Sequence, residues 1–455
     1  MTTTTRTVCE YIAGARTATI DPEVRELARR HVLDTLASVV ACRDLEPSAV
    51  ARRFAVANSA YPSGVSVLGT HDRVSLVDAV FAGAMAGHGA EINDFMPSVY
   101  VQPGPAVVAT ALGLAECRGH SGDEVLRAIV TGYELSARVP RALGTDNLRR
   151  AGLANHGIGP VFGAAATAAS LSDLTPERVA DVLSCCAQQA SGSWQWLLDV
   201  AHIEKSLVFA GMGARNGIQA VLLVEAGYRG VPDSIDHPGG WWQARPFGGG
   251  DSDLAALTEG LDTPTALHDA AYKRYPVGGP TQPAIQALLE LVDEIDPTEV
   301  ERVDIAMPGR AAAFRDAAMP ALNLRYLTAL VLTEGRLDFE SAQSLDRMHH
   351  DTELGARMET VEVVHDPDQE TGTGRDRAES ARVTLTLRSG EQLERFVPHV
   401  RGFPSHPLDR GEVETKAREL MVPHLGSGRV DEIVDACWTL DHLERADRLV
   451  ELIAR

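Results

Sequence analysis

The sequence predicts a mainly α-helical protein, with a large helical bundle, a smaller α+β domain inserted into it, and a C-terminal segment that returns to the bundle. Apolar residues recur at spacings of three and four over most of the first 270 residues, which is helical periodicity. Alternating, strand-like segments begin only near residue 300. Helical periodicity then returns after residue 405.

The segments with helical periodicity in the first part are 21–60, 73–90, 105–117, 122–140, 158–170, 176–190 and 206–227. The first opens with Asp21 and Pro22, a pair typical of a helix start. Alanine and glycine are dense in these segments. Side chains this small let helices approach closely, which favours a tight bundle over a sheet.

The character of the sequence changes near residue 270, where a turn-rich segment leads into a helix at 283–295. Strands are predicted at 300–308, 358–366 and 380–397, helices at 321–334 and 338–348, and a hairpin loop at 366–380. Helices return at 410–422 and 428–454. The domains are therefore a helical body at 1–269, an α+β insert at 270–405, and C-terminal helices at 406–455 that rejoin the body.

The composition excludes several classes of partner. The 455 residues include 63 acidic and 42 basic ones, a formal charge of −21, which argues against nucleic acid and anionic membranes as partners. There is no signal-peptide-like start and no run of about 18 apolar residues, so no membrane span is expected. The six cysteines show neither CxxC nor zinc-finger spacing, and we expect reduced thiols in a cytoplasmic protein.

Two side chains stand where helices begin. His156 precedes a helix marked by Gly and Pro, and a helix N-terminus disfavours an imidazolium, so His156 can act as a neutral base. Lys205 enters a strongly apolar helix, where a partly desolvated ammonium would bind a carboxylate tightly. The alternatives are a structural or exposed histidine and a lysine that extends to the surface.

Polar residues also gather in the segment 87–95, which holds His88, Glu91, Asn93 and Asp94. No cysteine or further histidine completes a metal site there, so we predict no metal; the carboxylates can orient other polar groups or share a proton. The glycines of 211–217 do not fit a dinucleotide loop, because the third comes one position late and no strand precedes them. Lys273, beside Arg274 at the domain junction, can clamp a carboxylate or form a surface charge pair.

Several stretches, taken in their order and spacing, resemble the MmgE/PrpD family. They include ARRHVLDTLASVVA, AGHGAEINDF, NHGIGPVFGAAATAASLSDLTPE, EKSLVFAGMGARNGIQAVLLVEAGYRG, KRYPVGGPTQPAIQALLEL, LNLRYLTALVLTEG and RGFPSHPLDRGEVETKA. That family includes 2-methylcitrate dehydratase, cis-aconitate decarboxylase and iminodisuccinate epimerase. The resemblance implies a helical domain with an α+β lid, a homodimer, no metal or organic cofactor, and a small carboxylic acid bound between body and lid.

The resemblance also implies roles for single residues. His156 matches the family's catalytic histidine, Lys205 its active-site lysine, and Tyr326 a tyrosine of the lid. The remaining matches, expected to contact the substrate, are Lys273 in the lid and the acidic pair Glu91 and Asp94.

Three positions depart from the family pattern. Gln102 replaces a histidine, Phe95 a threonine and Gly278 a cysteine. Glutamine does not shuttle protons at neutral pH, so a mechanism with two histidines is unavailable. Phe95 makes the site less polar, and Trp194 and Trp196 add apolar surface if they face it. These departures put the family's usual tricarboxylate substrates in question.

The sequence therefore predicts a cofactor-independent lyase that dehydrates or decarboxylates a small carboxylic acid by moving a proton next to a carboxylate. Lys205, with Lys273 second, would stabilise the developing charge, and His156 would act as acid and base. Tyr326 would donate to a leaving hydroxyl or reprotonate the carbanion. Two alternatives stay open: an isomerase or epimerase on a less polar substrate, which the glutamine and phenylalanine departures favour, and a non-catalytic relative.

Overall fold

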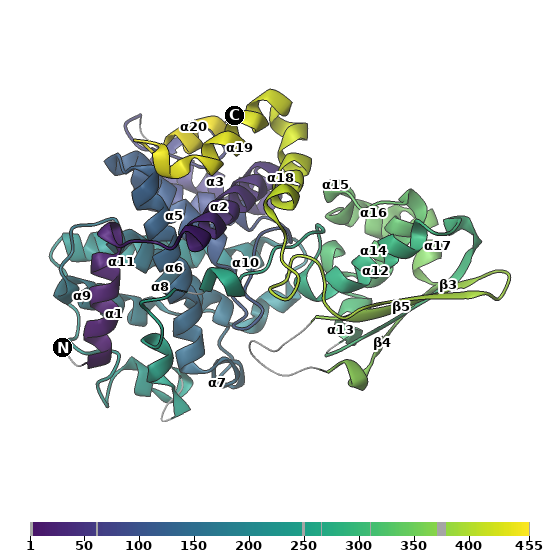
Figure 1. Cartoon of the computed structure of the whole chain (residues 1–455), viewed down its shortest axis with the longest axis horizontal. Coiled ribbons are helices and arrows are strands. Elements are labelled where there is room, and N and C mark those ends of the chain that lie inside the picture. The colour runs from purple at the N-terminus through teal and green to yellow at the C-terminus, as the bar shows by residue number, and fades with distance from the viewer. Residues whose placement is uncertain are drawn as a thin grey trace.

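The computed structural model describes residues 3–60, 62–247, 251–264, 266–309, 311–370 and 379–454. Two parts lie next to each other along the longest axis, a larger helical body and a smaller domain built on a four-stranded sheet (Figure 1). We call the smaller part, residues 271–403, the sheet domain. The predicted fold class, mainly α with a smaller α+β domain, is confirmed.

The body is built from the helices of the first half of the chain. They are α1 (Thr3–Gly14), α2 (Pro22–Cys42), α3 (Glu46–Ser59), α4 (Leu76–Gly87), α5 (Pro103–Arg118), α6 (Gly122–Leu143), α7 (Thr145–Arg150), α8 (Asn155–Ser170), α9 (Pro176–Gln189), α10 (Ile203–Ser206) and α11 (Met212–Glu225). At the predicted start of α2, the Asp21 side chain accepts a hydrogen bond of 2.8 Å from the backbone N–H of Glu23. This cap and Pro22 at the first helical position explain why the helix begins there.

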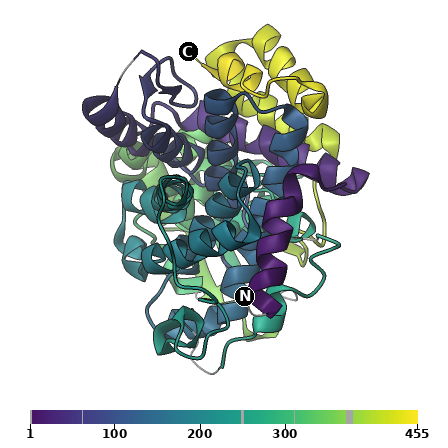
Figure 2. The ribbon, with the colours of Figure 1, turned by 90° about the vertical axis from the view of Figure 1, so that its left-hand side faces the viewer.

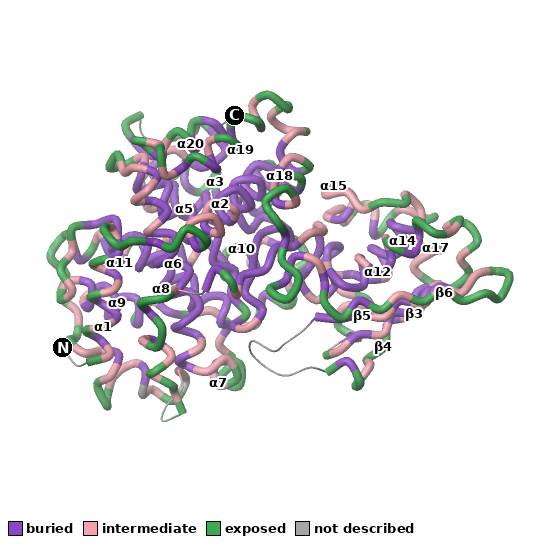
Figure 3. The backbone as a smooth tube through the Cα atoms, in the orientation of Figure 1, coloured by how far each residue is buried: buried purple, intermediate pink, exposed green. Residues whose placement is uncertain are grey.

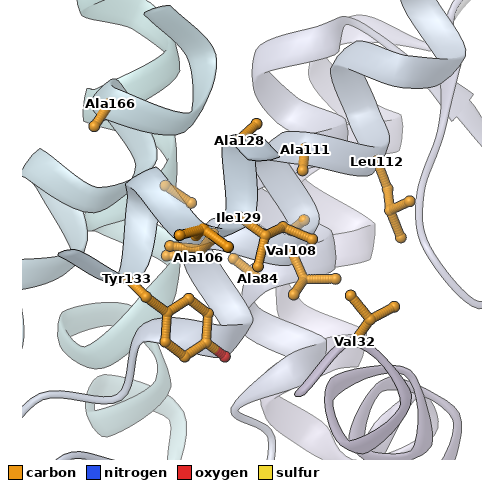
Figure 4. Close-up of a cluster of buried hydrophobic side chains, with 14 of the residues drawn as sticks. Val32, Ala84, Ala106, Val108, Ala111, Leu112, Ala128, Ile129, Tyr133 and Ala166 are labelled. Carbon is orange, nitrogen blue, oxygen red and sulfur yellow. The ribbon is translucent and has the colours of Figure 1, made fainter. Parts of the chain in front are cut away.

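The small residues do bring helices together, as the composition predicted. A Cβ on Gly132 of α6 would lie 2.1 Å from the hydroxyl oxygen of Thr167 in α8, and one on Gly163 of α8 would lie 1.9 Å from that of Ser136 in α6. Neither position therefore has room for a larger residue. Figure 4 shows the adjoining core, in which Ala106, Val108, Ala128, Ile129 and Tyr133 pack among other buried side chains.

The C-terminal helices are α18 (Arg410–Leu425), α19 (Ser427–Trp438) and α20 (Arg448–Ile453). They lie on the body, with α18 at the border to the sheet domain and α19 and α20 further from it (Figures 1 and 2). Helix α18 packs along α2, and α19 packs against both. Their apolar side chains, from Val413 to Ile453, belong to the same hydrophobic cluster as those of α2, α5 and α6. The chain thus leaves the body, forms the sheet domain and returns.

The sheet domain has two layers, with helices on one face of a sheet (Figure 1). Its strands are β3 (Val300–Met307), β4 (Val361–His365), β5 (Ala381–Leu387) and β6 (Gln392–Val397), in the order β4-β3-β5-β6. Its helices are α12 (Gln282–Val292), α13 (Ala311–Arg315), α14 (Leu324–Glu334), α15 (Phe339–Ala342), α16 (Leu345–His350) and α17 (Thr352–Met358). Side chains along β5 alternate between buried and half-buried, as expected for a sheet covered on one face (Figure 3).

Three predictions about strands were wrong. A short antiparallel pair, β1 (Val65–Ser66) and β2 (Arg73–Val74), lies in the body, where no strand was expected. The segment 380–397 forms two strands, β5 and β6, instead of one. No hairpin joins β4 to β5, because β3 lies between them and pairs parallel with β4 and antiparallel with β5. The middle of that connection, 371–378, lies outside the described residues.

One helical stretch among the described residues, Ile203–Glu225, is long and apolar enough to cross a membrane by length and composition alone. It contains α10, one π-helical turn (Leu207–Gly211) and α11. It packs against α4, α8 and α9, and 61% of its most apolar window is buried inside the molecule. These surroundings are those of a core helix, so the stretch is weak support for a membrane span.

Candidate active site

The loop between α4 and α5 carries most of the predicted site residues of the body, and lysines from two distant segments hold its backbone. The ammonium of Lys273 donates a 3.0 Å hydrogen bond to the carbonyl of Asn93. Lys416, on α18, donates one of 2.6 Å to the carbonyl of Ile92. The loop backbone next to Glu91 is therefore tied both to the domain junction and to the C-terminal helix.

Glu91 lies at the centre of a buried charge cluster. Its carboxylate forms an ion pair with Lys205 and lies 3.4 Å from the ammonium of Lys273. All three side chains are at most 5% exposed. Burial by itself would raise the pKa of Glu91, but the two ammonium groups outweigh it and hold the pKa well below its usual range. The predicted carboxylate and both predicted cations therefore meet.

Lys205 owes its position to an irregular start of its helix. His202 precedes α10 with a left-handed backbone, φ 62°, and the Asp199 carboxylate accepts a 2.8 Å hydrogen bond from the backbone N–H of Lys205. A π-helical turn follows directly, from Leu207 to Gly211. Such turns are frequent at functional sites because they redirect side chains within a helix. The apolar helix that the sequence showed therefore continues past Lys205, with an irregular turn beginning two residues after it.

His156 lies in the first turn of α8, one step further into the helix than predicted. Its Nδ1 is 3.0 Å from the amide oxygen of Gln102, which can only accept from it. Nδ1 is therefore the donor in this contact, which selects the tautomer whose Nε2 bears the lone pair. Gln102, which cannot transfer protons, thus sets the tautomer of the residue predicted to do so.

Aromatic rings surround the same imidazole. Phe209, in the π-helical turn, stacks on it with centroids 4.0 Å apart and planes 7° apart. Trp194 and Trp196 meet it edge-on, at 5.5 Å and 5.3 Å. The Nζ of Lys205 lies 5.1 Å from the Trp196 ring and 5.3 Å from the Phe209 ring. The predicted base and the predicted cation are therefore neighbours that share two rings.

Phe95 joins the site to the sheet domain. Its backbone forms an antiparallel bridge with Ala271, with hydrogen bonds of 3.0 Å and 2.7 Å. Its ring lies 5.3 Å from the Nζ of Lys273 and packs edge-on against Phe403 of the sheet domain at 5.1 Å. The other junction cation, Arg274, forms ion-paired hydrogen bonds of 2.9 Å and 3.2 Å with Glu419 on α18. Lys273 is the junction cation that reaches Glu91.

Asp94 has a different surrounding from Glu91. Its carboxylate accepts hydrogen bonds from the Tyr133 hydroxyl at 2.5 Å and from the backbone N–H of Gly104 at 3.1 Å, and His31 lies 3.0 Å away. A Cβ on Gly104 would lie 2.5 Å from this carboxylate, so the glycine lets the start of α5 approach. These partners favour the predicted orienting role of a carboxylate over direct contact with a substrate.

Tyr326 does not join the site. It is buried in a cluster of the sheet domain with Ile285 and Leu330, and its hydroxyl donates a 2.7 Å hydrogen bond to the carbonyl of Ser341. This geometry gives no support to the catalytic role expected from the family resemblance. Gly278, the third departure, packs against Leu322: a Cβ there would lie 2.1 Å from that side chain.

Three buried side chains offer the donor atoms of a metal site. Those of His88, Glu91 and His202 lie within 4.8 Å of one another, so a further histidine does join the segment, contrary to the sequence analysis. Burial lowers the pKa of His88, and it lowers that of His202 to about 3, so both rings are neutral. Glu91, however, is already paired with two ammonium groups, whose charges oppose a divalent cation there.

Sequence reasoning missed several residues of the site. Phe209 stacks on His156 and also on His88, with the centroids of the Phe209 and His88 rings 4.9 Å apart. Lys416 forms a 2.5 Å ion pair with the buried Asp34 of α2. The sequence signal for Lys416 was its place among the regularly spaced apolar residues of α18, because lysine rarely lies on an apolar helix face without a partner. No local signal marks Phe209, which resembles any other core residue.

Comparison with protein families decides the relationship. The model of the MmgE/PrpD N-terminal domain matches residues 6–252, and that of the MmgE/PrpD C-terminal domain matches residues 275–440. The chain belongs to the MmgE/PrpD family. Within the N-terminal match lie Glu91, His156 and Lys205, whereas Lys273 lies between the two matches.

Two proteins from Aspergillus species are similar to the chain. A cis-aconitate decarboxylase-like protein of Aspergillus oryzae is 24% identical over 486 residues, covering 99% of the chain and 97% of that relative. Cis-aconitate decarboxylase of Aspergillus terreus is 27% identical over 247 residues, which cover 51% of the chain and 48% of the enzyme. The chain is thus related to lyases, at identities too low to transfer one activity.

Proposed function

We propose that this protein is a lyase that moves a proton at the carbon next to a carboxylate, using its own side chains without a cofactor. The observation that carries the proposal is the meeting of His156 and Lys205 around Phe209 and Trp196, with Lys205 paired to a buried Glu91. An imidazole and an ammonium so placed can serve one organic anion from two sides.

Lys205 and Lys273 supply the electrostatic part of this function. Removing a proton next to a carboxylate spreads negative charge onto the carboxylate oxygens. An ammonium fixed beside them stabilises that charge by about 3 kcal/mol, because water is excluded and the donor needs no reorganisation. Glu91 keeps both ammonium groups in place before the substrate binds, as its ion pair with one and its 3.4 Å contact with the other imply.

His156 supplies the proton transfer. With Gln102 holding the proton on Nδ1, the Nε2 lone pair is the base that removes the substrate's proton. In a dehydration, the electrons of the broken C–H bond form the new double bond, the hydroxyl leaves, and the imidazolium returns the proton to it as water. In a decarboxylation, the electrons of the broken C–C bond stay on carbon as CO₂ leaves. His156, after taking a proton from solvent, then protonates that carbon and returns to the neutral form.

The substrate would reach these buried groups through movement of the sheet domain. Lys273 and Phe95 lie where that domain joins the body, and the Phe95–Ala271 bridge links the two parts. We infer that the sheet domain acts as a lid, whose closure excludes water from the developing charge.

An isomerase or epimerase is the second candidate, and the position of Tyr326 favours it. With that hydroxyl bonded to Ser341, His156 is the acid or base that the site offers for proton return. An isomerase that returns the proton on the face from which it was taken can use this one group alone, whereas an epimerase also needs a group that delivers the proton to the opposite face.

Incubation with candidate acids in deuterated water tests the proposal. A lyase produces water or CO₂ with an unsaturated or shortened product, followed by NMR, whereas an epimerase incorporates solvent deuterium without either loss. We expect Lys205→Ala and His156→Ala each to lower turnover at least about 100-fold. Near wild-type turnover in either variant would refute the assigned role, and no reaction with any acid would favour a non-catalytic relative.

We also propose a homodimer, as the family resemblance implies. Leu197 and Leu198, which follow Trp196, are 59% and 82% exposed, and large apolar side chains in that state favour an interface. Light scattering coupled to size exclusion tests this directly. A monomer mass at micromolar concentration would contradict it.

A further inference from the structure

The charges around Glu91 can compensate the charge of one further carboxylate. Lys205 and Lys273 contribute two positive charges and Glu91 one negative charge, and all three are buried. The balance of this cluster is therefore one positive charge. A monoanion would neutralise it, whereas a dianion or trianion would leave one or two negative charges buried without cations, which is costly in a site that excludes water.

The next charged groups add no net positive charge to this balance. Lys416 pairs with Asp34 at 2.5 Å, so the two cancel. The Asp94 carboxylate, held by Tyr133 and Gly104, adds a negative charge to the surroundings. Its presence makes a second or third substrate carboxylate less favourable still.

The rest of the neighbourhood is aromatic. Phe209 and Trp194 lie against His156, and Phe95 lies beside Lys273 at the opposite end of the charge cluster. Trp194 is fixed in place by a 3.0 Å hydrogen bond from its indole N–H to the carbonyl of Leu153. Rings held this rigidly favour an apolar or aromatic group of a ligand over a charged one.

Trp196 adds one polar feature to this wall. It is 8% exposed, it lies next to both His156 and Lys205, and its indole Nε1–H forms no hydrogen bond with the described residues. A buried donor without an acceptor is unfavourable, because it has lost its hydrogen bond to water and gained none. An oxygen of a bound ligand would remove that cost, so this donor points to a ligand with a carboxylate or hydroxyl oxygen.

We propose that the substrate is a monocarboxylic acid that carries an apolar, preferably aromatic, substituent beside its reacting carbon. The carboxylate binds to Lys205 and Lys273 beside Glu91, and the substituent packs on Phe209, Trp194 and Trp196. This inference rests on the proposed function and narrows it, because it excludes tricarboxylates as substrates.

Three acids that differ in their number of carboxylates test the inference with the full-length protein: 3-hydroxy-3-phenylpropanoate, malate and citrate. In 3-hydroxy-3-phenylpropanoate, a phenyl ring takes the place of the second carboxylate of malate, and citrate carries a third carboxylate. Calorimetry gives the Kd of each, and NMR in deuterated water follows exchange at the carbon next to the carboxylate. We expect the phenyl acid to bind about 10- to 100-fold more tightly than malate, with citrate weakest.

Variants assign this preference to the aromatic wall. Trp196→Ala should reduce the phenyl-to-malate ratio about 10-fold, and Trp196→Phe, which keeps a ring and removes the donor, should weaken both acids alike. Trp438 on α19 is the matched control, since it is also 8% exposed and its indole N–H has no hydrogen-bond partner in the part of the chain that the structure describes. Trp438→Ala should leave the ratio unchanged. Trp194→Arg, which adds a cation at a half-buried position, should shift the preference toward malate.

Two results overturn the inference in different ways. If malate or citrate binds more tightly than the phenyl acid and undergoes exchange or elimination, the substrate class is wrong and the proposed function stands. If none of the three acids binds or exchanges, the substrate class and the proposed function both fail.

Discussion

Replacing Lys416 by methionine would test the ion pair that joins α18 to α2. The ammonium of Lys416 lies 2.5 Å from a carboxylate oxygen of Asp34, and the two side chains are 4% and 0% exposed. It also donates to the carbonyl of Ile92, next to Glu91. Methionine preserves the length and apolar stem of the side chain, so the loss is that of the charge and its hydrogen bonds.

The expected cost is large because Asp34 would remain buried without a partner. Removing one member of a buried ion pair costs about 3–5 kcal/mol. With an unfolding entropy of about 2.1 cal/mol/K per residue over the roughly 320 residues of the helical body, that corresponds to a drop in Tm of about 4–8 °C. Burial already raises the pKa of Asp34 against the effect of Lys416. Protonation removes the uncompensated charge, so the deficit of the variant should shrink as the pH is lowered.

Urea denaturation followed by circular dichroism measures the effect, with Lys416→Met/Asp34→Leu as the matched control. The double variant removes both charges and should recover at least about 2 kcal/mol of the loss, because an apolar pair of similar volume replaces the ion pair. If Lys416→Met folds and loses less than about 1 kcal/mol, or if the double variant is no more stable than the single one, the reasoning is refuted.

Three further predictions follow from the site. In a steady-state assay, Gln102→Leu should lower kcat at least about 10-fold with little change in KM, because the N–H at Nδ1 of His156 loses its acceptor. Gln102→Glu keeps an acceptor oxygen and should retain more activity in the same assay. The pKa of Glu91 is depressed in the folded protein, so the stability that its charge contributes is complete above about pH 4.5 and is lost as the pH falls through the folded-state pKa. Denaturation of wild type and Glu91→Gln at a series of pH values measures this contribution. The stability difference between the two proteins should be constant near neutral pH and shrink only in acid. Tyr326→Phe should cost about 1 kcal/mol of stability through the lost hydrogen bond to Ser341 and leave turnover near wild type, and a 100-fold loss of turnover would instead restore its catalytic role.

The helices of the body could be predicted because their signals are local. Asp21 and Pro22 mark the start of α2. The density of small residues predicted a tight bundle, but only the structure shows that α6 and α8 touch at Gly132 and Gly163. Segment 300–308 could be recognised as a strand from its alternation. The pairing of β3 with both β4 and β5 could not, because alternation shows that a segment is a strand and does not specify its neighbours.

The residues of the site could also be predicted only in part. His156, Lys205 and Glu91 were found from residue type, local setting and family resemblance, but the resemblance alone suggested that they meet. Glu91 and Lys205 are 114 positions apart, and Asp34 and Lys416 are 382 apart. Pairs this distant depend on the packing of whole helices, which no local pattern encodes. The irregular backbone around His202, which positions Lys205, likewise leaves no mark in hydrophobic periodicity.

The return of the chain to its first domain has a consequence for biosynthesis. During translation the body emerges early, yet the loop beside Glu91 is held by a side chain of α18, which emerges only after the entire sheet domain. A nascent polypeptide therefore has an incomplete core until α18 leaves the ribosome, and premature termination before it would yield a product prone to aggregation and degradation. The site around Glu91 and resistance to degradation would then both be completed late in synthesis, when α18 packs on the body.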